Sequence, residues 1–420
     1  PGDIKKSDLI FYINSDDEDE IMPPPKSHKK LTQAQKDTLA EGIKQGAPYE
    51  AHWSFIPAVR PDVPALGEKH PIDNFIKAGL KGSGHQMSQP ADKATIDRRI
   101  SFDLTGLPLH LTGTSDPDKL LASPHFGERM AVFWLDLARY ADTAGYHSDK
   151  VRDVTPYRDY VINAFNKNKP YDQFVTEQLA GDLLKDPGKW QKVASGYNRL
   201  LQTTHEGGLQ KKEYDAIYAA DRVRNVSAVW MGATVGCAQC HDHKYDPYSI
   251  KDHYSMAAFF ADLHDTGFDG NSLPTRRPPE MIFYSDEDER HLARITKDMG
   301  ALIGTSEVTN ALKKEAEITK LKANKKRKPA DDKKLAQLEK SFEQIVSSFK
   351  KDKWAKLLAE KKTIDKKGRY TMITAAKPHR EMHVLPRGNW LDDSGPIVTA
   401  ALVPVPVPAA AESEELNQAI

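Results

Sequence analysis

Apolar residues recur at helical spacing through the middle of this chain, and this pattern constrains the fold more than any other feature. Between Ile72 and about Asp262, successive segments place apolar side chains three or four residues apart, so each segment has one apolar face. The clearest segments are 72–80, 126–141, 157–166, 170–179 and 213–235. Alternation typical of strands is scarce. The sequence therefore predicts a mainly α protein, with a multi-helical domain over residues 72–308.

The segments on either side differ from this domain in composition. Residues 1–57 contain an acidic run and a helical pattern that Thr32 can cap and Gly46 can end, and a Pro-rich linker follows at 58–71. Residues 309–362 hold 17 Lys and Arg against 8 Asp and Glu, with a break at Pro329. This predicts a basic helical hairpin, either solvated or acting as a docking arm for an acidic partner. Residues 363–420 are expected to hold short strands, at 369–375 and 383–385, and a Pro/Val-rich tail.

Composition excludes several classes of protein. Sixty basic and sixty acidic residues cancel, so the chain lacks the positive field typical of nucleic-acid binders, and no nucleic-acid partner is expected. No apolar run approaches the roughly 18 residues of a membrane-spanning helix, so no transmembrane segment is expected in this stretch. The chain begins at Pro1 without an initiator Met or a targeting pattern, which indicates the middle of a longer protein.

Both cysteines of the chain lie in one motif, Cys237-Ala238-Gln239-Cys240-His241. This is the C-x-x-C-H pattern of covalent haem attachment. Two thiols about one helical turn apart can form thioethers to two vinyl groups on one porphyrin edge, and the adjacent imidazole can bind the iron. We therefore expect haem c, held by Cys237 and Cys240, with His241 as iron ligand. A zinc site that uses these residues or His243 with a carboxylate, and a redox dithiol, remain alternatives.

The residues around the motif suggest further roles. The polar run from Asp242 to Pro247 could tune the haem, or it could form a capped turn in which Asp242 and Asp246 accept backbone hydrogen bonds. His205 and His253 are candidate distal ligands, ahead of Met231 and Met256. An open distal position would favour catalysis over electron transfer.

A second group of polar residues precedes the motif. Asp136 and Arg139 lie at i and i+3 and are expected to pair on one helix face. The alternative is a polar pocket beside the haem, in which paired carboxylates act as acid and base. Its members would be Asp136, Arg139, Asp142, Asp149, Tyr157, Arg158 and Asp159, with Glu206 as a separate candidate.

Seven short motifs in a fixed order resemble a known family. They are residues 103–108, 122–129, 134–142, 157–159, 170–172, 178–182 and 237–247. Together they resemble the planctomycete-type cytochrome c proteins, exported multi-domain proteins of Planctomycetes and Verrucomicrobia. The resemblance implies that residues 1–57 are the C-terminal part of a cytochrome c-like domain. It also implies that Met22, in Met22-Pro23-Pro24, is a candidate axial ligand of a second haem attached upstream, although Met22 could simply pack before a polyproline turn.

These observations predict a c-type cytochrome that transfers electrons, with a redox partner protein. A haem-linked oxidoreductase acting on a polysaccharide or similar substrate is the first alternative, and a structural or glycan-binding scaffold is the second. Whether the chain is an enzyme stays open at this point. Because thioether attachment takes place outside the cytoplasmic membrane, a periplasmic or otherwise exported location is expected.

Overall fold

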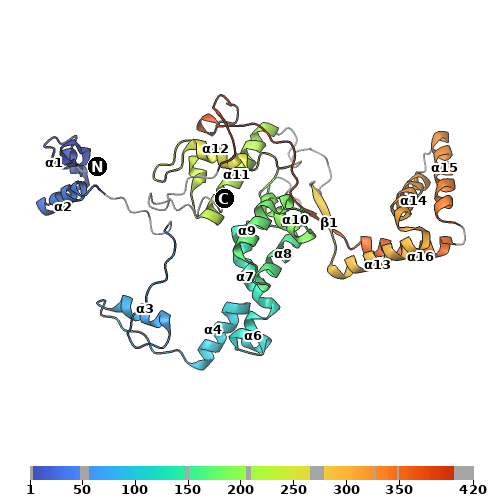
Figure 1. The fold of residues 1–420 in the computed structure, drawn as a ribbon, viewed down its shortest axis with the longest axis horizontal. Helices are drawn as coiled ribbons and strands as arrows, with labels where there is room; N and C mark the ends of the chain where they lie inside the picture. The colour runs from blue at the N-terminus through green and yellow to red at the C-terminus, as the bar shows by residue number, and fades with distance from the viewer. Residues whose placement is uncertain are drawn as a thin grey trace. The chain divides into compact units, whose positions relative to one another are not determined.

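The chain is mainly α-helical, as the apolar spacing predicts (Figure 1). The computed structural model describes residues 3–47, 56–146, 149, 151–204, 210–264, 279–324, 328–347 and 350–401. Sixteen α-helices and four short strands lie in these ranges. None of the helices found there is long and apolar enough to span a membrane. The described chain forms two compact units, one that ends at Ser88 and one that begins at Gln89.

The first unit contains α1 (Asp8–Asn14), α2 (Gln33–Lys44) and α3 (Pro71–Leu80). Thr32 caps α2 as expected, since its Oγ1 accepts the N–H of Gln35 at 3.3 Å. Gly46 follows the end of α2 with a φ of 95°, a conformation that glycine adopts without steric cost. Helix α3, which the sequence assigns to the domain after the linker, groups with this unit.

The second unit begins with α4 (Lys93–Thr105), two short helices, α5 (Leu109–Thr112) and α6 (Pro117–Leu121), and then α7 (Pro124–Leu137). Helix α7 packs along α8 (Thr155–Asn166). Gly127 permits this approach, because a Cβ atom there would lie 2.4 Å from the carbonyl oxygen of Ile162. The two helices thus pack at a distance that only glycine allows at this point.

The main core lies among α7, α8, α9 (Tyr171–Ala180), α10 (Lys189–Ser195), α11 (Lys211–Met231) and α12 (Ile250–Ala258). Trp134 packs against this core, with ring centroids 4.6 Å from Trp230 and 4.9 Å from Phe174. The Trp134 indole N–H donates to Gln178 Oε1 at 2.9 Å, so the polar atom of this partly buried ring is satisfied. Aromatic burial of this kind is a large contribution to stability.

Two helix boundaries differ from the sequence expectation. Helix α11 ends at Met231 rather than at Val235, because Gly232 has a φ of 60° and its N–H bonds to the carbonyl of Ser227. Val235 instead starts a separate 3-10 turn, η6 (Val235–Gln239). Pro170, expected as the first residue of α9, is the residue just before it.

Residues 286–365 form four helices with a core of their own: α13 (Asp286–Ile303), α14 (Val308–Ala323), α15 (Pro329–Ile345) and α16 (Lys351–Asp365). Helices α14 and α15 form the expected hairpin (Figure 1). The ion pairs Lys322–Glu339 and Lys334–Glu317 join the two helices. The structure adds a third helix, α16, in this basic region. It packs on α13 because Trp354 is buried against the core that contains Ile295.

The four short strands form two antiparallel pairs, and three of the strands come from the C-terminal segment. Strand β1 (Glu280–Phe283) pairs antiparallel with β2 (Arg369–Met372), and β3 (Met382–His383) pairs antiparallel with β4 (Ile397–Val398). Strand β2 falls in the first segment where a strand is expected, 369–375, and β3 overlaps the second, 383–385, only at His383. Val384 and Val398 pack against Tyr254 of α12, which places the end of the described chain beside the helix that follows the C-x-x-C-H motif.

Candidate functional site

The C-x-x-C-H motif begins on the 3-10 turn η6 and ends two residues after it. Buried residues of the turn attach it to the main core. Val235 and Ala238 are completely buried in the main core, whereas Cys237, Cys240 and His241 are exposed. Side chains three residues apart on a 3-10 turn point the same way. The buried pair therefore anchors the turn in the core. Cys237 lies within the turn, Cys240 directly follows its last residue, and both thiols are exposed.

His241 has the hydrogen bonding of a metal-binding histidine. Its Nδ1 lies 2.7 Å from the carbonyl oxygen of Asp242, so Nδ1 carries the proton and donates. In the neutral ring Nε2 then keeps its lone pair, and the carbonyl contact orients the imidazole. Two free thiols and one imidazole with an available Nε2 are the donor set that a covalently attached haem requires, so the residues fit this group.

His243, two residues further on, has a structural role. Its Nδ1 accepts the backbone N–H groups of Tyr245 and Asp246, at 3.2 and 2.8 Å. Nε2 must then carry the proton, and it donates to Thr234 Oγ1 at 2.9 Å. Both ring nitrogens are engaged, so His243 closes the turn.

The carboxylates of this run also support local structure. Asp242 accepts the backbone N–H of Ile250, the first residue of α12, at 2.8 Å, as the capped-turn interpretation predicts. Asp246 accepts the hydroxyl of Thr234 at 2.9 Å, a side-chain donor rather than the expected backbone donor. The capped turn is thus present, with one partner different.

The zinc alternative has no assembled ligand set in the part of the chain that the structure describes. No three His, Cys, Asp or Glu side chains come together there in a way that could hold an ion. A zinc site that used His243 would also require the turn around Thr234 to open.

His253, a predicted distal ligand, is buried beneath the motif. Its side chain is 1% exposed, and its Nδ1 lies 3.2 Å from the carbonyl oxygen of Val235. Burial lowers the pKa of His253 to about 4, so the ring is neutral near pH 7. The side chain lines a cavity of about 180 Å³ together with Gln239 and Tyr254. Among the described contacts none joins His253 to His241.

The C-terminal segment covers one side of the motif. Gly388 lies so close to Cys240 that a Cβ atom at position 388 would be 2.9 Å from Sγ. The Tyr254 hydroxyl lies 3.2 Å from the carbonyl oxygen of Gln239 and 3.5 Å from that of Leu385, which connects the motif to this segment. Nothing in the sequence pattern indicates this contact, because the two segments are far apart along the chain.

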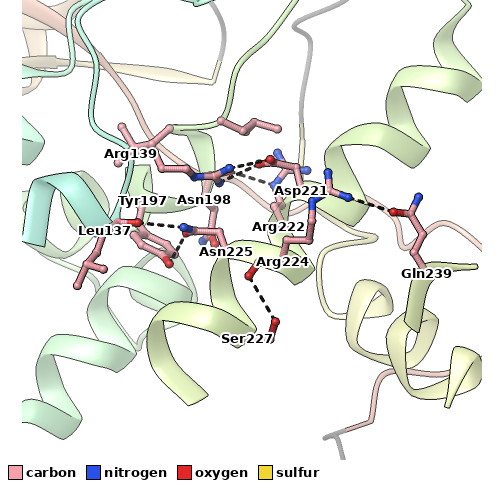
Figure 2. A network of polar contacts seen from close by, with 12 residues as sticks. Leu137, Arg139, Tyr197, Asn198, Asp221, Arg222, Arg224, Asn225, Ser227 and Gln239 are labelled. Atoms are coloured by element: carbon pink, nitrogen blue, oxygen red, sulfur yellow. Dashed lines mark hydrogen bonds and ion pairs between the residues drawn. The ribbon is translucent and has the colours of Figure 1, made fainter. Parts of the chain in front are cut away.

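A polar network joins the motif to α11 and the core (Figure 2). Arg224 donates to Gln239 Oε1 at 3.0 Å, and the Asn225 amide donates to the carbonyl of Leu137 at 3.0 Å. The Tyr197 hydroxyl donates to Asn225 Oδ1 at 2.6 Å. Side chains of a single helix therefore position the residue between the two cysteines and the end of α7.

The expected pairing of Arg139 with Asp136 is wrong. Arg139 instead forms a bidentate ion pair with Asp221 of α11, with N–O distances of 2.7 and 2.8 Å (Figure 2). Helix α7 ends at Leu137, and Arg139 has a left-handed φ of 59°. The i to i+3 relationship holds only inside a helix, so it does not apply here.

The remaining carboxylates of this group have separate partners. Asp142 accepts a hydrogen bond from the Tyr140 hydroxyl at 2.7 Å, and Asp149 accepts one from the Gly145 N–H at 2.7 Å. Asp159 accepts one from the Arg369 guanidinium at 3.4 Å. Tyr157 is buried and donates to Gln178, and Arg158 lies 3.8 Å from Asp159. The described structure does not assemble these residues into a pair of facing carboxylates.

Three other predicted residues lie in the first unit or outside the described ranges. Met22, in the first unit, is 48% exposed and lines a cavity of about 610 Å³ with His28. His205 and Glu206 lie outside the described residues.

Comparison with known proteins gives one family. Residues 71–265 match the model of PSCyt2, which is described as a protein of unknown function (DUF1549). No curated protein and no solved structure matches the chain. The identification as a planctomycete-type cytochrome c family protein is therefore wrong: the matching family is described only as being of unknown function, and the match carries no cytochrome assignment. The comparison supports similarity to PSCyt2 over residues 71–265.

Proposed function

We propose that the turn at residues 237–241 attaches haem c covalently and that the chain transfers electrons through it. The observation that carries this proposal is a short segment with two free, exposed thiols at i and i+3, followed by an imidazole whose Nδ1 is hydrogen-bonded to the carbonyl of Asp242, which leaves Nε2 for a ligand. This combination is the attachment chemistry of c-type haem.

Each residue of the turn would have a distinct part. Cys237 and Cys240 would hold the macrocycle through their sulfur atoms, and His241 would bind the iron through Nε2. The bound haem would supply a one-electron couple between ferric and ferrous iron. The hydrogen bond from His241 Nδ1 to the carbonyl of Asp242 would keep the ring oriented and make Nε2 more basic. Buried Val235 and Ala238 would keep the turn rigid.

Electron transfer is favoured over catalysis by the hydrogen bonds of the candidate carboxylates. Asp242, Asp246, Asp142 and Asp149 each accept a hydrogen bond that holds local structure. None of them is poised as an acid or base for a polysaccharide substrate. The proposal includes an exported location, where thioether attachment takes place, and a redox partner protein. A second haem upstream, with Met22 as ligand, would extend the electron path.

Expression in an exported compartment together with a c-type maturation system tests attachment. The parent chain should keep a Soret band and the added mass of one haem under denaturing conditions. Cys237→Ala combined with Cys240→Ala should abolish the added mass, and His241→Ala should change the spectrum while leaving at least one thioether. His125→Ala, at an exposed histidine on α7, is the matched control and should behave like the parent.

Three results would contradict the proposal. A parent chain without haem, in cells that load another c-type protein, would exclude attachment at this turn. One zinc ion per chain, removable by a chelator, would instead establish the zinc alternative. Rapid carbon monoxide binding to the reduced haem protein would favour the oxidoreductase, because an electron carrier with both axial positions filled does not bind the gas.

A further inference from the structure

A second, larger cavity lies in the main unit away from the C-x-x-C-H turn. Its volume is about 420 Å³, and it lies among α9, the 3-10 turn η4 (Gly181–Leu183) and the C-terminal ends of α11 and α12. Apolar side chains form most of its wall: Leu179, Trp230, Met231, Met256, Phe259 and Phe260. None of residues 237–241 is among the lining residues, so the cavity is separate from the proposed haem site.

The cavity has a buried floor and an open mouth. Met256 and Phe260 are 6% and 8% exposed, whereas Leu183 and Phe259 are 63% and 48% exposed. A cavity of this size with predominantly apolar walls is the usual form of a small-molecule site. The exposed aromatic and aliphatic side chains at the mouth give an entering molecule an apolar path.

Two carboxylates interrupt the apolar wall. Asp182 and Asp262 are both lining residues. Within the described ranges, neither carboxylate forms an ion pair or accepts a hydrogen bond. A carboxylate beside an apolar wall is less well solvated than one on an open surface, so a bound cation gains more from it. Rings such as those of Trp230, Phe259 and Phe260 also attract cations to their faces.

We propose that this cavity binds a small organic cation with an apolar body, such as an aryl or alkyl ammonium. The walls would bury the apolar body, and Asp182 and Asp262 would face its positive charge. The inference gives a role to residues 178–182, one of the sequence motifs that the haem proposal leaves unused, since Leu179, Ala180 and Asp182 all line the cavity. It does not depend on haem attachment.

Titration calorimetry with the full chain tests whether the cavity prefers a positively charged ligand to a negatively charged one. Benzyltrimethylammonium and phenylmethanesulfonate share an aromatic ring and a similar size but carry opposite charges. The parent chain should bind the cation at least about tenfold more tightly than the anion. Equal affinities, tighter binding of the anion, or no binding of the cation would overturn the proposal without any variant being needed.

Variants then locate the binding. Asp182→Asn combined with Asp262→Asn should remove most of the preference for the cation, whereas Asp103→Asn, the same charge change on exposed residue 103 of α4, should leave it intact. Ala180→Phe should fill the cavity and weaken binding of the cation. A preference that survives in the double variant would overturn the proposal, and melting curves show which variants are folded. If a variant fails to fold, the comparison of the two ligands on the parent chain still decides.

Discussion

Gly388 lies directly against Cys240: a Cβ atom at position 388 would be 2.9 Å from the Sγ atom. The glycine is the last residue of the 3-10 turn η9 (Pro386–Gly388) and has a φ of 70°. The second thiol of the motif is therefore bordered by a segment from the end of the described chain, and any group attached to Cys240 must share space with that turn.

Gly388→Ala should destabilise the protein and reduce the reactivity of Cys240. The left-handed φ costs an alanine about 1 kcal/mol, and the added methyl group contacts Sγ. Urea unfolding and the rate of alkylation of Cys240 measure the two effects. Gly113→Ala is the control, because Gly113 has a φ of 68° and nothing within 4 Å of its Cβ position. Equal stability loss in both variants, with Cys240 alkylated at the parent rate, would contradict the contact.

The ion pair between Arg139 and Asp221 should give a measurable coupling energy. Its geometry is bidentate, but Arg139 is 43% exposed, so solvent screening limits the coupling to about 1 kcal/mol. A double-mutant cycle with Arg139→Met and Asp221→Asn, followed by urea unfolding, measures it. The same cycle with Asp136→Asn should give a value near zero. A larger coupling to Asp136 than to Asp221 would restore the pairing expected from sequence spacing.

Stability should fall in mildly acidic solution because of His253. The pKa of this buried side chain is about 4 in the folded protein, against 6.5 ordinarily. Between these values the unfolded chain binds a proton that the folded chain does not, so the free energy of unfolding decreases as the pH falls from 6.5 toward 4. The full contribution, present above pH 6.5, is about 3 kcal/mol. His253→Gln removes this titration.

The measurement compares urea unfolding of the parent and His253→Gln near pH 7 and near pH 4.5. Each protein is compared with itself, so a constant loss from the substitution cancels. The parent should lose more stability on acidification than the variant. An identical loss in both proteins would show that His253 is not the group responsible.

Trp354→Ala should unfold the four helices α13 to α16 locally. Trp354 is 2% exposed, and its indole N–H donates to Glu315 Oε2 at 2.6 Å. Truncation of a buried tryptophan costs about 3–5 kcal/mol, and this core is separate from the main one. Hydrogen exchange should accelerate in residues 286–365 and stay unchanged in α8 and α11, which serve as the internal control. Uniform acceleration throughout the second unit would show that the two cores unfold together.

Local features of the fold could be predicted because their causes are local. Apolar residues at helical spacing indicate α7, α8, α9 and α11, and the Thr32 cap and Gly46 stop set the ends of α2. The apolar pattern predicts too late an end for α11, because the left-handed φ of Gly232 ends the helix although the pattern continues past it. Helix α16 was missed as a separate element because Trp354 and its apolar neighbours find their partners on α13, some sixty residues earlier.

The sequence by itself determined the helical class of this protein and the donor atoms of its candidate site, since two thiols and an imidazole lie within five consecutive residues. Only the tertiary structure decided which neighbours those groups have. Four such relationships join residues that are distant along the chain. They are the contact of Gly388 with Cys240, the hydrogen bond between His253 and Val235, the ion pair of Arg139 with Asp221, and the two carboxylates that line one apolar cavity. Such contacts depend on how helices pack, and packing depends on the shapes of all the buried side chains together, which no spacing rule contains.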